Sequence, residues 1–324
     1  MSATLSSRLA SGRTILLDGG VGTEIRRRGA TMDSAAWCAV ANRTDPDIVR
    51  GVHEDYLRAG ADILTANTFA TARHVLDGAG IGDEAPALTR RAVELAIEAR
   101  ERVASDREIP IAGSMSNTVA WIAGTFSRDP RFFPTPEQEI TNYREVAESL
   151  AEAGVDLIVL EMMLDLDRAA RAIAAAAETG LPLWIGMSAT LLDDGTVLAW
   201  DPVHEEPPER IAADAVRRAP LAFDDLARSL ASAHPVAAGS AAAAAGVMHS
   251  TLEATDAALA QLRHHWSGPF LAYPEATSLH PVEPGELAGR CADWVEQGVQ
   301  IVGGCCGTTP SHVAAIAEAL GRNP

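Results

Sequence analysis

Basic residues are scarce in this sequence, which has 26 Lys and Arg residues against 44 Asp and Glu residues and a formal net charge of −18. Affinity for nucleic-acid phosphates comes mainly from clustered cations, and no such cluster is present, so a nucleic-acid partner is not expected. Long apolar runs are also missing, since none approaches the roughly 18 residues that a membrane span needs. Residues 1–8 lack the apolar core of a signal peptide. We therefore expect a cytoplasmic protein without a membrane partner.

Cysteine is rare as well, with four residues in the chain, Cys38, Cys291, Cys305 and Cys306. Thiols are kept reduced in the cytoplasm, so these residues are expected to bind metal, take part in catalysis or be inert, rather than to form disulfides. Cys291 lies in an amphipathic helical stretch, and Cys38 lies in a stretch without other metal-ligand types. Both are expected to be small buried hydrophobic residues.

The length of the chain, 324 residues, suits one large domain, because a TIM-type barrel takes about 250 residues. Short apolar runs alternate with amphipathic helical stretches throughout, which is typical of parallel βα units. Eight such runs predict an α/β fold, a (β/α)8 TIM-type barrel formed by residues 1–324 as a single domain. The expected strands are 14–17, 61–64, 109–112, 156–160, 183–187, 236–247, 270–273 and 300–302. The alanine-rich sixth run favours a helix or a loop as much as a strand.

Local signals mark both ends of the expected helices. Capping residues precede a proline at Thr44-Asp45-Pro46, Thr135-Pro136 and Thr309-Pro310, and Thr135 with Gln138 has the form of a capping box. Glycines that accept a left-handed conformation end helices a few residues before the next strand, at Gly60, Gly154, Gly180 and Gly298. The longer connections, 116–135 and 190–208, therefore follow strands, on the side where barrel active sites lie.

The strongest chemical signal is residues 303–310, GGCCGTTP, which follow the last expected strand and precede the last expected helix. Two soft thiolates with flanking glycines suit zinc, because the metal needs close approach and an open coordination position for a substrate. Without its flanking residues, an adjacent cysteine pair is equally consistent with a structural role. Cys305 and Cys306 are therefore candidate zinc ligands.

The sequence resembles the zinc-dependent homocysteine S-methyltransferase family, which includes betaine–homocysteine and S-methylmethionine–homocysteine methyltransferases. Three segments carry the resemblance, in the same order and across nearly the whole chain. They are residues 16–24 (LLDGGVGTE), residues 59–69 (AGADILTANTF) and residues 303–310 (GGCCGTTP). The last segment is highly specific to the family.

The resemblance implies a barrel, one catalytic zinc ion (Zn2+) and methyl transfer from a donor to homocysteine, giving methionine. Cys305 and Cys306 match the paired zinc ligands. Asp18 and Gly19 match the turn that contacts the amino-acid part of homocysteine, and Glu161 matches an acid that faces the same substrate. The matching segments extend the implied substrate-binding set to Gly20, Thr23 and Asn67. The structural alternatives are a helix-entry turn for Asp18 and a solvated strand end for Glu161.

One position departs from the family pattern in a way that concerns the metal. The third zinc ligand is normally a cysteine after the sixth strand, in a Gly-x-Asn-Cys context, where this chain has Gly246-Val247-Met248-His249. His249 would then be the third ligand, since a Cys2His site with an open fourth position is an established catalytic arrangement. Neutral imidazole in place of a thiolate would make the centre less negative. The alternative is a His249 that only lines the pocket, with the metal weakly held or absent.

A second departure follows the seventh strand, where Tyr273-Pro274-Glu275-Ala276 replaces a stretch that usually carries asparagine and then a small residue. An altered substrate pocket is expected there. His280, in the next loop, is a spare candidate ligand, although a loop histidine is usually solvated.

Aromatic residues are few, with 6 Trp, 3 Tyr and 6 Phe, yet Trp121, Phe126, Phe132 and Phe133 gather in the loop after the third strand. Aromatic faces attract sulfonium and quaternary ammonium groups by about 0.5–2 kcal/mol each. This indicates a cationic methyl donor, or else a loop held together by its own aromatic cluster.

The partners expected are thus a small-molecule thiol and a methyl donor. Three alternatives stay open: a different thiol acceptor, hydrolysis by water activated at a Cys2His zinc, and a non-catalytic binding protein.

Overall fold

The computed structural model describes residues 3–213, 219–232 and 242–322. Eight parallel strands form one sheet in the order β1-β10-β9-β8-β5-β4-β3-β2. Its two end strands are linked, because the Asp62 amide donates to the Leu16 carbonyl at 2.8 Å and the Leu16 amide donates to the Asp62 carboxylate at 2.9 Å. The sheet therefore curls into a TIM-type barrel, as predicted. Its strands are β1 (Ile15–Leu16), β2 (Leu64–Ala66), β3 (Ile111–Ser116), β4 (Leu157–Glu161), β5 (Leu183–Met187), β8 (Ala242–Met248), β9 (Phe270–Tyr273) and β10 (Val299–Val302).

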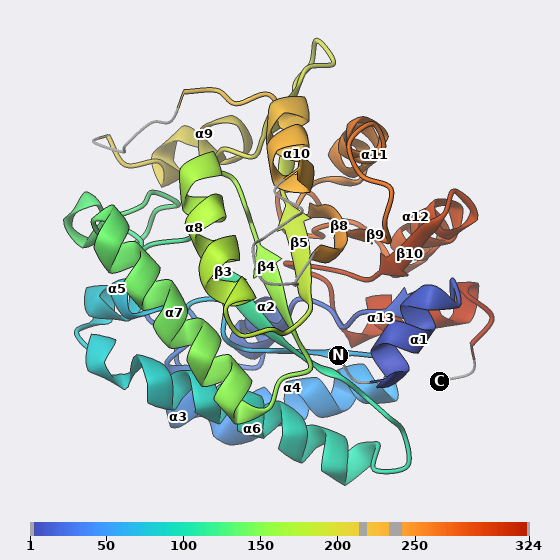
Figure 1. The fold of residues 1–324 in the computed structure, drawn as a ribbon, viewed down its shortest axis with the longest axis horizontal. Coiled ribbons are helices and arrows are strands. Elements are labelled where there is room, and N and C mark those ends of the chain that lie inside the picture. The colour runs from blue at the N-terminus through green and yellow to red at the C-terminus, as the bar shows by residue number, and fades with distance from the viewer. Residues whose placement is uncertain (1–2, 214–218, 233–241, 323–324) are drawn as a thin grey trace.

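Helices surround the sheet, as Figure 1 shows. The longer ones between or after barrel strands are α4 (Pro46–Arg58), α6 (Ala85–Val103), α7 (Pro136–Ala153), α8 (Leu166–Ala177), α10 (Phe223–Ser232), α11 (Leu252–Leu262), α12 (Pro284–Glu296) and α13 (Pro310–Ala319). Shorter helices are α1 (Ala3–Ala10), α2 (Val21–Arg27), α3 (Ala41–Thr44), α5 (Arg73–Leu76) and α9 (Pro202–Glu205). Among the described residues, none of these helices combines the length and apolarity of a membrane span.

Alternation along the strands divides the apolar residues into two cores. Ile15 and Leu17 point into the barrel, where they pack with Trp184, whereas Leu16 between them packs outward against the helices. Leu5 of α1 is fully buried and belongs to the inner core. The barrel interior is thus filled by side chains, which leaves the ends of the strands for a binding site.

The strand predictions are confirmed with shifts of a few residues at most ends. The sixth predicted strand, 236–247, overlaps β8, and its residues 236–241 lie outside the described part of the chain. The helical or loop alternative is wrong for Ala242–Met248, which pair with β5 and β9. The connection 190–208 is not simply a loop. It contains most of an antiparallel hairpin, β6 (Ala189–Leu191) with β7 (Val197–Ala199), which turns at Gly195 and extends the barrel rim.

The helix signals are confirmed at most positions. Gly60, Gly154, Gly180 and Gly298 all have positive φ, and Thr135 forms a capping box with Gln138. The expectation for the start of α4 is wrong in one detail, because Asp45 makes no capping hydrogen bond. Its carboxylate accepts instead from the Thr31 amide at 2.9 Å and the Thr44 hydroxyl at 2.7 Å.

Candidate metal centre and active site

A cavity of about 820 Å3 opens at the carboxyl ends of the barrel strands. Its walls include the connections after β1, β8 and β10, which hold Asp18, His249 and the two adjacent cysteines. Residues far apart in the sequence meet here because parallel strands end at the same rim of a barrel. The cavity is thus the candidate active site.

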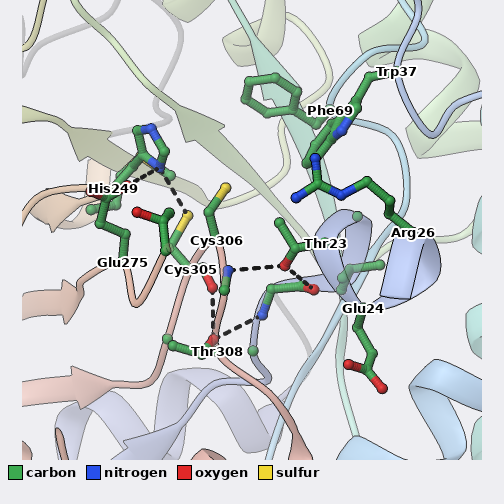
Figure 2. A pocket seen from close by; sticks show the side chains of 18 of the residues that line it. Thr23, Glu24, Arg26, Trp37, Phe69, His249, Glu275, Cys305, Cys306 and Thr308 are labelled. Atoms are coloured by element: carbon green, nitrogen blue, oxygen red, sulfur yellow. Dashed lines mark hydrogen bonds and ion pairs between the residues drawn. The ribbon is translucent and has the colours of Figure 1, made fainter. Parts of the chain in front are cut away.

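Cys305, Cys306 and His249 come together on one wall of this cavity. One ligand atom from each residue lies within 4.8 Å of the other two, and among the described residues this is the one group of its kind. His249 Nδ1 lies 3.9 Å from Cys305 Sγ, and Figure 2 shows both thiols between the imidazole and the opposite wall. The structure therefore unites the three residues that the sequence singled out as ligands.

The turn that carries the cysteines is fixed by hydrogen bonds to the first connection of the barrel. The Thr308 hydroxyl donates to the Cys305 carbonyl at 2.7 Å and accepts from the Gly20 amide at 2.9 Å. The Gly307 amide donates to the Thr23 hydroxyl at 3.0 Å. Gly307 has a φ of +82°, and an added Cβ would lie 1.9 Å from the Ala276 carbonyl oxygen. Only glycine fits this position, so the motif glycines shape the cysteine turn.

The two thiols are electrostatically unequal. The hydrogen bond with Cys306, together with burial, holds the pKa of Cys305 well above its ordinary value. The same hydrogen bond, helped by the charge of His249, lowers the pKa of Cys306 well below its ordinary value. Without a metal the pair therefore shares one proton, with the negative charge on Cys306. A cation between the thiols would release that proton.

The residues present fit a zinc ion. Two thiolates and an imidazole are ligands that zinc prefers, and three protein ligands leave a fourth position for a substrate. The observation in favour is the clustering itself, since two half-buried cysteines that face a buried histidine otherwise have to share a proton.

Asp18 and Glu161 form a second polar group in the cavity. Asp18 is 3% exposed, and its carboxylate accepts from the Thr65 amide at 2.6 Å and the Thr65 hydroxyl at 2.8 Å. Burial raises the pKa of Asp18 to about 7 against these hydrogen bonds, and the charge of Glu161 adds to the rise. Burial likewise raises the pKa of Glu161 to about 7, although Ser114 donates a hydrogen bond to it. A cation bound between these two carboxyl groups would lower both pKa values and favour their ionised forms.

The other predicted substrate residues also line the cavity, although their polar groups are largely engaged. Gly20 and Thr23 bind the cysteine turn. The Asn67 side chain donates to the Cys38 carbonyl at 3.0 Å and to Asn42 Oδ1 at 2.8 Å. It also accepts from the Cys38 thiol at 3.0 Å. Gly19 lies against Tyr56, where an added Cβ would come within 2.7 Å of the ring.

The expected aromatic cluster after β3 is divided by the structure. Trp121 and Phe126 line the cavity, whereas Phe132 and Phe133 are outside its described lining. An arginine already lies over one face of three of these four rings. Arg210 is 4.1 Å from the centre of Phe126, Arg131 lies over Phe132 and Arg168 lies over Phe133. These three phenylalanines are therefore poor candidates for holding a cationic donor.

Sequence reasoning missed a different aromatic pair, Trp37 and Phe69. Both line the cavity, and their rings meet edge to face with centres 6.1 Å apart (Figure 2). Trp37 also has a φ of +50°, a conformation that costs a non-glycine residue about 1–3 kcal/mol and is common at binding sites. Neither residue stood in a ligand-like motif. The available signal was the location of Phe69 in the second family-like segment.

The remaining cysteines are buried, as expected. Cys38 is 1% and Cys291 0% exposed, and burial raises the pKa of each thiol to about 12. His280 Nε2 lies 4.0 Å from a Glu275 carboxylate oxygen and outside the group of three ligands.

Fold and site together define a barrel enzyme with a candidate metal centre at the carboxyl ends of its strands. The chain belongs to the homocysteine S-methyltransferase family, whose model matches residues 15–320. It is 29% identical over 329 residues to a homocysteine S-methyltransferase from Escherichia coli (strain K12), covering 93% of this chain and 94% of that relative. It is 28% identical over 346 residues to a selenocysteine methyltransferase from Astragalus bisulcatus, covering 97% of this chain and 95% of the relative.

A solved structure supports the same placement. The homocysteine methyltransferase MmuM from Escherichia coli, in its metallated form, matches with a TM-score of 0.69 and 25% identity, covering 96% of this chain and 98% of that chain.

Proposed function

We propose that this protein transfers a methyl group from a cationic donor to the thiol of homocysteine, giving methionine, with a zinc ion held by His249, Cys305 and Cys306. The observation that carries the proposal is the meeting of this ligand group with Asp18 and Glu161 in one cavity. Family membership and the metallated relative support the same reading.

The acceptor is an amino acid with a thiol. Asp18 and Glu161 offer two carboxylates to its ammonium group, and both become fully ionised once that cation is bound, because an opposite charge lowers a carboxyl pKa. Zinc, when bound, holds a thiol as its thiolate at neutral pH, where a free thiol with a pKa of about 8.5 is mostly protonated. The chain positions the two ends of the acceptor between the carboxylates and the cysteine turn.

The donor carries a positive charge on the sulfur or nitrogen that bears the methyl group. Trp37 and Phe69 supply aromatic faces for that charge, and cation–π attraction is worth about 0.5–2 kcal/mol per ring. Arg26 reaches toward the same pair in Figure 2, and no ion pair of this arginine occurs among the described residues. This arrangement favours a donor that has a carboxylate as well as its cationic centre.

Substitution of the donor site provides a direct check. Trp37→Ala should raise the Michaelis constant for the donor by roughly 2- to 30-fold, the equivalent of the cation–π energy, and leave that for homocysteine nearly unchanged. Trp121→Ala serves as the matched control on the same cavity. An unaltered donor constant in the Trp37 variant would exclude this placement.

The hydrolase and the non-catalytic alternatives are less well supported. An activated water would not need a pair of carboxylates such as Asp18 and Glu161 in the same cavity, and a binding protein would not need a histidine and two thiols gathered at one point. A different acceptor, such as a selenol, uses the same site and is tested by direct competition with homocysteine. We also propose a cytoplasmic location, where reducing conditions keep Cys305 and Cys306 available.

The decisive experiment measures zinc and activity together. Protein purified under reducing conditions should contain about one zinc per chain and form methionine from homocysteine with a sulfonium or betaine-type donor. The His249→Ala variant should lose most of both. Absence of zinc after reconstitution, or full zinc content in the variant, would contradict the Cys2His assignment.

A further inference from the structure

The two positions at which this sequence departs from the family pattern are in contact. His249 Nδ1 lies 3.4 Å from Glu275 Oε2, and the two residues are 8% and 7% exposed. Nδ1 is also the ring nitrogen that faces Cys305. A buried carboxylate therefore stands beside the same imidazole nitrogen that faces the cysteines.

The backbone fixes Glu275 in this place. The Glu275 amide donates to the Ser250 carbonyl at 3.0 Å, and the His249 amide donates to the Tyr273 carbonyl at 3.2 Å. On its other side the same segment is bonded to the cysteine turn, since the Cys305 amide donates to the Pro274 carbonyl and the Ala276 amide donates to the Cys306 carbonyl, each at 2.8 Å.

Residues 273–276 thus bridge the histidine loop and the cysteine turn by hydrogen bonds on both sides. The backbone of Glu275 cannot move away without disturbing one of the two connections, whereas its side chain can rotate. The barrel rim, through these hydrogen bonds, fixes where Glu275 lies relative to the candidate ligands.

The distance between Glu275 and His249 suits two ligands of one metal ion. Two ligand atoms about 2.1 Å from a tetrahedral metal lie about 3.4 Å apart, which is the separation between Glu275 Oε2 and His249 Nδ1. The carboxylate stands at the edge of the group, because among the described residues only His249, Cys305 and Cys306 have ligand atoms within 4.8 Å of one another. Rotation about the glutamate side-chain bonds is needed to bring it closer.

The charges argue for the same role. A neutral imidazole in place of a thiolate removes one negative charge from a zinc centre, and a carboxylate beside it restores that charge. Glu161 also carries a negative charge that acts on His249 and on both thiols, but the proposed function assigns this carboxylate to the ammonium group of the acceptor. His280, at 4.0 Å from Glu275, is a further base, and Trp200 meets the His249 ring edge to face.

We propose that Glu275 is a fourth, exchangeable ligand of the metal centre, which holds the open position until the acceptor thiol takes it. The inference rests on the proposed ligand group, but it concerns metal binding and can hold even if the acceptor is not homocysteine. The ligand set would be His249, Cys305, Cys306 and Glu275, with the glutamate as the residue that leaves.

Metal affinity provides the test, measured by competition with a chromogenic chelator for zinc. Glu275→Gln keeps the shape and removes the charge, so it should weaken zinc binding about 10- to 100-fold. Glu206→Gln is the matched control, because Glu206 lines the same cavity and pairs with Arg210 at 2.8 Å. It should leave zinc affinity unchanged.

A double-mutant comparison separates charge compensation from simple loss of structure. In a His249→Cys background the thiolate restores the missing charge, so Glu275→Gln should cost less than about threefold there. Equal losses in both backgrounds, or equal losses for the Glu275 and Glu206 variants, would overturn the proposal.

Cobalt-loaded protein gives a second readout that does not depend on activity. The visible ligand-field bands of the wild-type protein should shift on Glu275→Gln, and addition of homocysteine should bring the two proteins to the same spectrum, since the thiol has then displaced the glutamate. Spectra that already coincide before the thiol is added would show that Glu275 is not a ligand.

Discussion

Replacement of Asp18 by asparagine should separate what this carboxylate does for binding from what it costs in stability. Burial raises its pKa from 3.8 to about 7 in the folded chain. Between these two values the folded protein binds more protons than the unfolded chain does, so the free energy of unfolding falls as the pH rises through this window and is level above it. The stabilisation that the raised pKa of Asp18 gives the folded protein is therefore fully present below about pH 4 and is lost by about pH 7.

The expected size follows from the shift. About three pKa units correspond to about 4 kcal/mol over the whole window, and to about 3 kcal/mol between pH 5 and pH 8. An asparagine has no such titration, and its amide can accept from the Thr65 amide and donate to the Thr65 hydroxyl. Asp18→Asn should therefore gain stability relative to the wild-type protein as the pH rises from 5 to 8, and it should bind homocysteine far more weakly.

Urea unfolding of the metal-free, reduced protein at several pH values measures the first effect, and calorimetric titration of zinc-loaded protein with homocysteine measures the second. Asp106→Asn, at an exposed turn, is the control and should change neither. The reasoning fails if the stability difference between wild type and Asp18→Asn is the same at pH 5 and pH 8. It also fails if the variant binds homocysteine as the wild type does.

Three further expectations follow from the cysteine turn and the capping box. Gly307→Ala should abolish zinc binding, since its Cβ would lie 1.9 Å from a backbone oxygen, and a variant with normal zinc content would contradict this. In metal-free protein, iodoacetamide should modify Cys306 before Cys305, as followed by peptide mass spectrometry, with zinc suppressing both; reaction at Cys305 first would reverse the assigned charges. Thr135→Ala should lower the free energy of unfolding by about 1 kcal/mol in urea without change in either Michaelis constant.

The fold could be predicted from the sequence because its signals are local. Apolar runs of strand length alternate with helices, and Gly60, Gly154, Gly180 and Gly298 take the left-handed conformation that their positions indicated. The β6–β7 hairpin differs from the prediction of a long connection over residues 190–208, although Asp194-Gly195 is a typical hairpin turn. Local turn chemistry therefore indicates this hairpin as well.

The candidate site was only partly predictable, because its contacts join distant segments. Cys305 and Cys306 stand in a specific motif, whereas the contact between His249 and Glu275 depends on the register of β8 against β9. The donor side stays a prediction. Two of the four expected aromatic residues, Trp121 and Phe126, line the cavity, but a cluster in sequence does not indicate which ring faces are already covered. Arg210 over Phe126 is visible only in three dimensions.

Backbone strain gives an independent reason to place function at this cavity. Three non-glycine residues in the described part of the chain have positive φ, Trp37, Met162 and His249, and all three line the cavity. Each such conformation costs about 1–3 kcal/mol and persists only where the surroundings enforce it. The three residues belong to different connections of the barrel, so no single turn explains them. A glycine at each position would adopt the same φ without this steric cost. The shared feature is the cavity that their side chains face, so the same rim that brings the thiols, the imidazole and the buried carboxylates together also holds the strain.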